Sequence, residues 1–409
     1  MKLPRVFAAA RSPDFRLFWA SNSVVLGGYW VSWVSMQLII SRLTNAASSA
    51  VGLLTFFSLV PMLLLLPYAG VIADRYERRR VLQTSQLGLA LVAALLALVG
   101  IFHLTSVPLI YALAFALGVG QAMGAPAMQA LVADAVPRED LVSAVSLTSV
   151  TLNVARMVFP VAALPLVVWG GPQAAFALYA VAALSSVVLI GRVRMPRHVV
   201  TDTDFRFWSR LRHGWLHVRE RPPATTVLSM VAVTGLFTSC MTAYSPVIAT
   251  QILHRGDSGF FALTAAIGIG AAIGAFSVGF LSNGMRLWQQ TVLMLGAALS
   301  FCVVGVLTDF VATLAVVVVY GALLFATQTM LATTLQFLIE DSARGRVMSL
   351  YQLGWAGLIP IGSLGIGLLG SAIGPSRAMV AFGTVASAYA LVLLVRERAR
   401  PALIVSPAR

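Results

Sequence analysis

The stretch GVIADRYERRR, residues 70–80, lies where one long apolar run, residues 50–73, gives way to the next, residues 81–102. Each run holds the roughly 20 apolar residues that a helix needs to cross the hydrocarbon core of a bilayer. The turn between them gathers four arginines and two acids, Asp74 and Glu77, into a few positions. A charged turn between two such runs predicts a pair of membrane-spanning helices whose connection lies at the membrane surface.

The composition of the whole chain supports this interpretation. Of the 409 residues, 59% are hydrophobic and only 10% are charged, and the mean hydropathy is +0.89. An ordinary soluble domain carries about 25% charged residues, so a soluble protein of this size would expose far too much apolar surface. These values exclude a soluble globular enzyme, a disordered chain and a disulfide scaffold, and leave a multi-pass membrane protein.

Apolar runs separated by charged or turn-forming residues recur along the chain and predict twelve membrane-spanning helices. The predicted spans are residues 17–41, 50–73, 81–102, 108–132, 142–169, 173–191, 224–249, 259–282, 289–308, 311–337, 347–371 and 376–395. The predicted fold class is therefore an all-α polytopic membrane protein.

A long polar segment, residues 192–223, divides the predicted spans into six and six. We expect an N-terminal six-helix bundle at residues 1–191 and a C-terminal six-helix bundle with a short tail at residues 224–409. Apolar residues recur every three or four positions in the linker, which predicts a basic amphipathic helix lying on the inner leaflet. They are Phe205, Trp208, Leu211, Trp215 and Val218.

The positions of the basic residues predict the orientation. The N-terminal segment and every second connection after it lie on one side of the membrane, and they hold 24 of the 28 lysines and arginines. The connections on the other side hold three, and Arg156 lies within a span. Because basic loops stay in the cytoplasm, both termini and the linker are expected to be cytoplasmic. The net charge of +14 is then spread over many cytoplasmic segments, which argues against a nucleic acid partner.

Residues 70–80 resemble the helix 2–3 signature of the major facilitator superfamily, G-x-x-x-D-R-x-G-R-R, with Glu77 where a glycine is usual. Residues 125–141 resemble the helix 4–5 junction of its bacterial efflux branch, which includes enterobactin-exporter-like and macrolide-efflux-like proteins. The opening at residues 14–19 and the segment 344–351 are similar to the same branch. The resemblance extends over nearly the whole chain.

A second copy of the signature supports an internal repeat. Gly279 stands where Gly70 stands in the first copy, and Asn283 stands where Asp74 stands. Two six-helix repeats imply pseudo-symmetric bundles and alternating access to a central site between them.

The resemblance implies a secondary active transporter in the bacterial cytoplasmic (inner) membrane. It implies export of a small amphipathic molecule, such as a drug, a macrolide or a siderophore, with protons as the coupling ion. An importer or facilitator on the same fold and a non-transporting membrane sensor remain as alternatives. We predict a monomer with a small-molecule substrate and no cofactor. The sequence has no HExxH motif, no carboxylate pair in a span and no Ser-His arrangement, so we expect no enzyme and neither catalytic nor metal residues.

The resemblance also implies a cytoplasmic gate. Asp74 is expected to engage the cytoplasmic end of the eleventh helix near Arg346 when the gate closes, and Arg75 and Arg79 are expected to hold the loop. Gly70 is expected to let the second helix approach a neighbour closely. The alternative is that this charged turn serves only as a topology signal during insertion.

Arg156 lies near the middle of the fifth predicted span, where an arginine costs several kcal/mol unless it faces the bundle interior or water. Its segment resembles the exporter signature R-x-x-G-P-x-x-G-G, with Phe159 and Ala163 in place of glycines. One interpretation is that Arg156 attracts an anionic substrate group or helps to control proton movement. The other is a structural hydrogen-bond hub with Asn153 or Gln121.

Polar and aromatic residues near mid-depth are the candidate substrate-binding positions. An aromatic wall with a few amides and one cation suits a bulky amphipathic or aromatic ligand, neutral or anionic. The candidates are Asn22, Trp30, Trp33, Gln37, Gln121, Asn153, Arg156, Tyr244, Gln328, Gln352 and Trp355. No acid lies near the middle of a predicted span, so Asp134 and Asp309 are the proton-coupling candidates by proximity.

Overall fold

The computed structural model describes residues 5–193, 207–238, 240–281 and 286–398. Within these ranges the regular structure is helical, and eleven helices are long and apolar enough to cross a membrane. A shorter apolar helix segment, Leu141–Arg156, adds to them. The predicted all-α polytopic membrane fold is confirmed.

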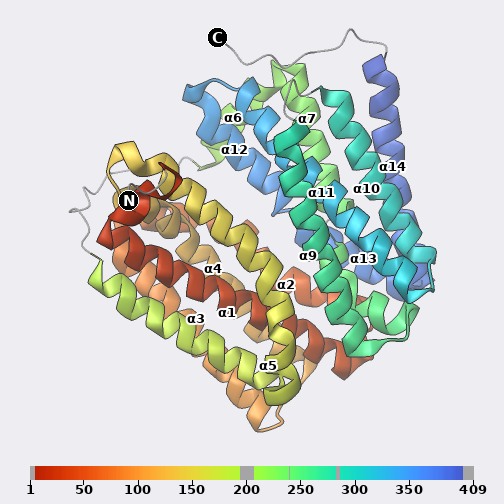
Figure 1. Cartoon of the computed structure of the whole chain (residues 1–409), viewed down its shortest axis with the longest axis horizontal. Coiled ribbons are helices and arrows are strands. Elements are labelled where there is room, and N and C mark those ends of the chain that lie inside the picture. Colours follow the sequence, from red (N-terminus) through yellow and green to blue (C-terminus); the bar gives the residue numbers. More distant parts are fainter. Residues whose placement is uncertain (1–4, 194–206, 239, 282–285, 399–409) are drawn as a thin grey trace. The chain divides into compact units, whose positions relative to one another are not determined.

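The chain forms two compact units (Figure 1). Unit 1 comprises Met1–Leu43 and Phe57–Phe205, and unit 2 comprises Thr44–Phe56 and Arg206–Arg409. The first turns of the second helix thus group with the second half of the chain.

Unit 1 is built from long helices preceded by a short 3-10 turn. They are η1 (Arg5–Arg11), α1 (Pro13–Thr44), α2 (Ser48–Arg75), α3 (Arg78–Ile101), α4 (Val107–Asp134), η2 (Arg138–Asp140) and α5 (Leu141–Arg192), and α1 and α2 each have one end in unit 2. The apolar window of α1 is 72% buried, more than that of any other described span, whereas that of α3 is 39% buried. α1 is therefore an inner helix, while α3 lies along α5 and α4 and keeps one face exposed (Figure 1).

Helix α5 reverses direction at Gly171, whose φ of 71° and ψ of 171° are not helical. Phe159, before this point, and Tyr179, after it, pack against neighbouring glycines of α1, Gly27 and Gly28. Twenty residues of straight helix would separate them by about 30 Å, so the chain must fold back between them. The fifth and sixth predicted spans are the two arms of α5, residues 141–170 and 172–192.

Unit 2 contains the remaining elements. They are α6 (Phe207–Arg219), α7 (Pro222–Val233), η3 (Thr234–Thr238), α8 (Met241–Val247), η4 (Ile248–Ile252), α9 (Gly256–Leu281), α10 (Leu287–Val306), α11 (Phe310–Leu338), α12 (Asp341–Trp355), α13 (Ile359–Ile373) and α14 (Pro375–Arg398). The seventh predicted span is interrupted by the π-helical turns η3 and η4, and the eleventh is divided into α12 and α13.

Helices α9 and α11 pack at backbone distance. A Cβ atom at Gly270 would lie 2.9 Å from the backbone nitrogen of Ala322, and one at Gly274 would lie 3.0 Å from the Cα of the same residue. Small residues at such crossings let membrane helices approach closely.

The linker helix α6 differs from the predicted single-faced amphipathic helix. Its Gly214 packs against the backbone of Arg346 on α12, and Val218 is fully buried. Trp215, which the sequence places on the same apolar face as Val218, is 46% exposed. One face of α6 therefore packs against α12, while Trp215 on the helix is exposed. Phe205 lies outside the described residues, as do the side chains of Trp208 and Leu211.

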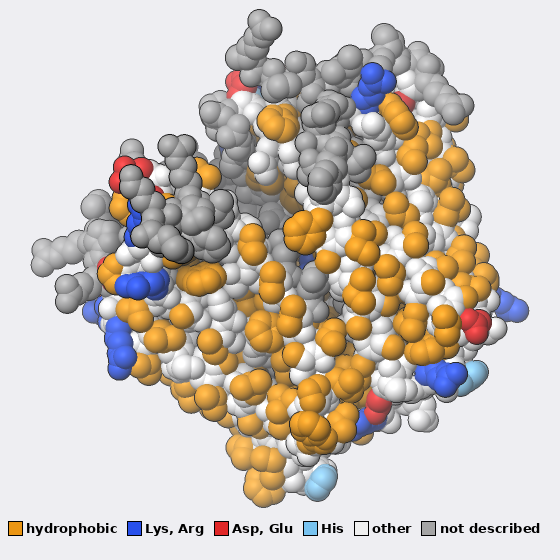
Figure 2. Space-filling view, viewed as in Figure 1, with side chains coloured by type: hydrophobic (Ala, Val, Ile, Leu, Met, Phe, Trp, Pro, Cys, Tyr) orange, Lys and Arg blue, Asp and Glu red, His pale blue; other side chains and the backbone are white. Residues whose placement is uncertain are grey.

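The visible surface of both units is largely hydrophobic, with charged side chains toward the helix ends (Figure 2). On α3, large apolar side chains with exposures from 41% to 63% recur every three or four residues. They are Leu87, Leu91, Leu95 and Leu98. A continuous apolar stripe of this kind is expected of a helix that faces lipid.

Candidate functional site

Arg156 lies within unit 1 beside an aromatic ring of α1. It comes from the first arm of α5, and its Cζ atom lies 5.5 Å from the centroid of the Trp30 ring. A guanidinium over an indole face is attracted by the ring quadrupole by about 0.5–2 kcal/mol, with the larger values at desolvated sites. The side chain of Arg156 is partly buried, so the charge expected from the sequence to face the bundle interior lies against an aromatic wall.

Two tyrosines connect this pair to other predicted positions. The Tyr29 ring lies 5.4 Å from Trp30 in an edge-on arrangement and stacks on Trp33 at 6.4 Å. It also meets Tyr179, from the second arm of α5, edge-on at 6.4 Å. The Gln121 side-chain amide of α4 donates a hydrogen bond of 3.0 Å to the Tyr179 hydroxyl.

The structure thus brings four predicted residues together around two that the sequence analysis missed. We call this set the arginine–aromatic cluster: Tyr29, Trp30, Trp33, Gln121, Arg156 and Tyr179. The indole Nε1 of Trp30 is buried and has no hydrogen-bond partner among the described residues. A buried donor without a partner costs about 1–3 kcal/mol, so a ligand acceptor at this position would stabilise the protein.

The glycine pair of α1 makes the cluster possible. A Cβ atom at Gly28 would lie 2.7 Å from Cδ2 and 3.0 Å from Cα of Tyr179, so only glycine lets the second arm of α5 come this close. Gly27 accommodates the Phe159 ring, which an added Cβ would approach to 2.8 Å. The large residue at 159 is therefore matched by a small one on the facing helix.

Two of the remaining predicted positions of unit 1 lie on α1, on either side of Trp30. Asn22 and Gln37 are buried on α1, with exposures of 6% and 1%. They are eight and seven residues from Trp30 on the same helix, about 12 Å and 10 Å along its axis. The amide nitrogen of Gln37 is buried without a partner among the described residues. The side chain of Asn153 lies outside the described residues.

The predicted residues of unit 2 other than Tyr244 lie on α11 and α12. The Tyr351 hydroxyl donates to the backbone oxygen of Gln328 at 3.3 Å. Gln352 is exposed, whereas Trp355 is 7% exposed and its backbone packs against Gly235 of η3.

Tyr244, another predicted ligand position, makes a contact to the start of α2. Its hydroxyl donates to Ser48 Oγ at 2.8 Å, and its side chain is 1% exposed. The hydroxyl is therefore committed to the first turn of α2. Tyr244 therefore belongs to an interhelical contact within unit 2.

This contact is part of a larger set within unit 2. The backbone nitrogen of Ser49 donates to Ser371 Oγ at 3.0 Å, and Gln251 Nε2 donates to the backbone oxygen of Ala46 at 2.9 Å. A Cβ atom at Gly52 would lie 3.0 Å from the Cα of Gly367. We call this set the α2 clasp: Ala46, Ser48, Ser49, Gly52, Tyr244, Gln251, Gly367 and Ser371.

The charged turn after α2 holds unit 1 together at one end. Arg78 forms an ion pair with Asp134 at 2.8 Å, with side chains 26% and 27% exposed. The Arg79 guanidinium donates to the backbone oxygen of Val193 at 3.4 Å. The role of Arg78 could not be predicted from the sequence, because nothing local indicates which of the arginines in this turn meets the end of α4.

The predicted gate residues are only partly described. An added Cβ atom at Gly70 would meet no atom within 4 Å, so the predicted close approach at this glycine is wrong for this conformation. Arg75 and Arg346 are exposed, and the side chain of Asp74 lies outside the described residues. The predicted contact between Asp74 and Arg346 is not tested.

The two acids proposed as proton carriers have structural partners. Asp134 is the partner of Arg78, and Asp309 caps α11 by accepting a 2.7 Å hydrogen bond from the backbone nitrogen of Ala312. Neither belongs to the arginine–aromatic cluster. Among the described residues, no group of three or more His, Cys, Asp or Glu side chains could hold a metal ion.

Comparison with known proteins identifies the family. The family profile described as "Transmembrane secretion effector" matches residues 5–403. The staphyloferrin A transporter of Staphylococcus aureus is 24% identical over 389 residues, covering 90% of this chain and 92% of that protein. The macrolide efflux protein A of Streptococcus pyogenes is 24% identical over 397 residues, covering 92% and 94%. The enterobactin exporter EntS of Escherichia coli is 24% identical over 394 residues, covering 95% and 93%.

Solved structures share the fold. A bacterial homologue of the human lysosomal transporter Spinster, in an inward-facing and occupied conformation, superposes with a TM-score of 0.73 at 16% identity, covering 97% of this chain and 99% of that one. A POT family transporter in complex with 5-aminolevulinic acid has the same TM-score at 13% identity, covering 94% and 96%.

Proposed function

The chain belongs to the transmembrane secretion effector family of the major facilitator superfamily, and on that premise we propose that it exports a small amphipathic molecule by alternating access in exchange for protons. It is a multi-pass membrane transporter whose relatives carry siderophores and macrolides by name. We place it in the bacterial cytoplasmic membrane as a monomer with both termini in the cytoplasm.

The observation that carries the proposal is Arg156 lying over Trp30 inside unit 1. An arginine at the centre of a membrane helix costs about 2.5–3.5 kcal/mol on insertion scales, so charged residues there commonly have a function. The aromatic rings around it offer stacking surfaces, and the unpartnered Trp30 donor offers a hydrogen bond. This combination suits an aromatic or macrocyclic molecule that carries an anionic or strongly accepting group.

Alternating access requires contacts that break when one side opens. In our proposal the bundles at residues 1–191 and 224–409 move as units, and the α2 clasp is the gate on the side away from the cytoplasm. Its hydrogen bonds from Tyr244, Ser49 and Gln251 are 2.8–3.0 Å long. Each such bond contributes about 0.5–1.5 kcal/mol, so the clasp can open and close at modest cost.

On the cytoplasmic side, the proposed gate comprises Asp74 with Arg346, supported by Arg75 and Arg79. Proton coupling is assigned to Asp134 in preference to Asp309. Protonation of Asp134 would release Arg78, and the turn that carries Arg78 also carries the gate residues, whereas Asp309 is committed to capping α11.

Accumulation assays in cells lacking their own efflux pumps test the proposal. Cells expressing the protein should retain less of at least one compound from a panel of aromatic dyes, macrolides and catecholate siderophores, and a protonophore should abolish the difference. Arg156→Gln should lose export, while Arg192→Gln, at an exposed position, should retain it. Net uptake, or export that the protonophore leaves intact, would contradict the proposal.

A further inference from the structure

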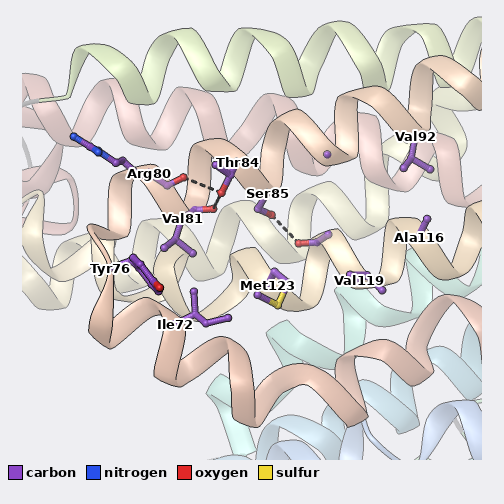
Figure 3. A pocket seen from close by; sticks show the side chains of 12 residues that line it. Ile72, Tyr76, Arg80, Val81, Thr84, Ser85, Val92, Ala116, Val119 and Met123 are labelled. Atoms are coloured by element: carbon purple, nitrogen blue, oxygen red, sulfur yellow. Dashed lines mark hydrogen bonds between the residues drawn. The ribbon is translucent and has the colours of Figure 1, made fainter. Parts of the chain in front are cut away.

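A groove of about 490 Å³ opens between α2, α3 and α4 of unit 1 (Figure 3). No residue of the arginine–aromatic cluster lines it. It is thus separate from the proposed substrate site. Its walls, its mouth and its length each restrict what it can hold.

The body of the groove is hydrocarbon. Ile72, Val119 and Met123 form its walls. Of the three hydroxyl-bearing residues that line it, Tyr76 is exposed near the Arg80 end (Figure 3), and the hydroxyls of Thr84 and Ser85 are already used. Thr84 Oγ1 donates to backbone oxygens within its own helix at 3.0 Å, and Ser85 Oγ donates to the backbone oxygen of Gly120 at 2.7 Å (Figure 3). Because these groups are satisfied internally, the groove offers an apolar ligand chain no competing polar partner.

A glycine keeps the groove open. An added Cβ atom at Gly88 would meet no atom within 4 Å, and Gly88 itself is exposed. A side chain at this position would project into the open space without displacing a neighbouring helix. The groove therefore depends on the absence of a side chain on α3.

The mouth of the groove is basic. Arg80 lines one end, and its side chain is 79% exposed while its Nε contacts Glu77 Oε2 at 2.7 Å. A guanidinium has five N–H donors, so one carboxylate contact leaves donors for a second anion. The six residues 75–80 contain four arginines and one glutamate, which attracts negative charge to this end.

The length of the groove matches one leaflet. Arg80 at the mouth and Val92, which also lines the groove, are twelve residues apart on α3, or about 18 Å along its axis. Half of a hydrocarbon core of about 30 Å is about 15 Å. A ligand with an anionic head at Arg80 and a chain reaching Val92 would therefore have the dimensions of a phospholipid in the leaflet.

From the hydrocarbon body, the basic mouth and the leaflet-length span, we propose that this groove is a binding site for one anionic phospholipid. Its phosphate contacts Arg80, and one acyl chain lies along Gly88. Anionic lipids are enriched in the cytoplasmic leaflet, and each arginine near the surface contributes about 1 kcal/mol to their binding. The proposal does not depend on what the protein exports.

Native mass spectrometry of the purified full-length protein, titrated with phosphatidylglycerol or phosphatidylcholine, tests the site. Wild-type protein should bind one phosphatidylglycerol more tightly than any further copies. Arg80→Gln should weaken that first binding step about fivefold without changing phosphatidylcholine binding. Gly88→Leu should remove the tight step for phosphatidylglycerol, because the added side chain occupies the path of the acyl chain.

Matched variants separate the site from general effects. Leu91→Phe enlarges an exposed side chain of the same helix, and Arg192→Gln removes an exposed arginine elsewhere in unit 1; both should bind phosphatidylglycerol as the wild type does. Replacement of glycine favours the helix, so Gly88→Leu should fold. A tight step that survives Gly88→Leu, or equal affinity for both lipids, would overturn the proposal. So would displacement of the lipid by an exported macrolide or siderophore, which would assign the groove to substrate.

Discussion

Replacing Gly28 by alanine should disrupt the arginine–aromatic cluster by pushing α1 away from the second arm of α5. The new Cβ atom would lie 2.7 Å and 3.0 Å from two atoms of Tyr179 and 3.2 Å from Cβ of Ala182. The nearest atom belongs to an aromatic ring and the next to the backbone, so neither can move independently of the helix. Overpacking of this kind lowers the free energy of unfolding by about 1–3 kcal/mol. The contacts of Tyr179 with Tyr29 and Gln121 would be strained as a result.

The assay is the apparent thermal unfolding midpoint of the purified protein in detergent, together with export by cells at matched membrane levels. Gly88→Ala is the control, because it adds the same atom where nothing lies within 4 Å. Alanine is favoured over glycine in a helix by about 0.8–1.0 kcal/mol, so the control should be unchanged or slightly more stable. Gly28→Ala should unfold several degrees lower and export less. If Gly28→Ala and Gly88→Ala have the same unfolding midpoint and the same export, the close packing described for Gly28 is refuted.

Three further perturbations address other contacts. Tyr244→Phe and Ser48→Ala should each lower the unfolding midpoint, because each removes the same hydrogen bond, which contributes about 0.5–1.5 kcal/mol. The double variant should therefore be no less stable than either single variant. Additive losses of stability in a double-mutant cycle would contradict the contact. Asp309→Ala should lower the free energy of unfolding by about 0.5–2 kcal/mol, because α11 loses its N-terminal cap. The same variant should keep the dependence of export on the proton gradient, as measured in vesicles with an imposed pH difference. Asp134→Asn should uncouple export from that gradient, since Arg78 loses its charged partner; a wild-type response to pH in this variant would remove Asp134 from the mechanism.

Hydropathy and charge predict the architecture because they are local properties. Each span is a continuous apolar run, and the fold follows from such runs with little reference to partners. The reversal at Gly171 is also visible locally, since Gly170, Gly171 and Pro172 stand together between two apolar runs. Arg156 stands out for a similar reason, because a charge inside an apolar run requires an explanation wherever it occurs.

Pairings between distant helices are not local, and here the sequence-based predictions were incomplete. Tyr179 reaches the cluster only because α5 folds back and Gly28 admits it, and no periodicity within either helix indicates this. Tyr244 resembled a cavity residue because it is a polar aromatic in an apolar span, but its partner Ser48 is 196 positions away. The glycine pair of α1 was the available signal, since two adjacent glycines in an inner helix indicate close neighbours on two sides.

The central claim is that Arg156 binds the exported molecule within the arginine–aromatic cluster. The most direct measurement is transport in proteoliposomes of the compound selected by the cell assays, compared between wild type, Arg156→Lys, Arg156→Gln and the exposed control Arg192→Gln. A hydrogen bond to a charged group contributes about 1.5–3 kcal/mol, and 1.4 kcal/mol is a factor of ten in affinity. We predict that Arg156→Gln raises the half-saturating concentration at least tenfold, that Arg156→Lys gives an intermediate value, and that Arg192→Gln matches wild type. A half-saturating concentration for Arg156→Gln equal to that of wild type would contradict the claim.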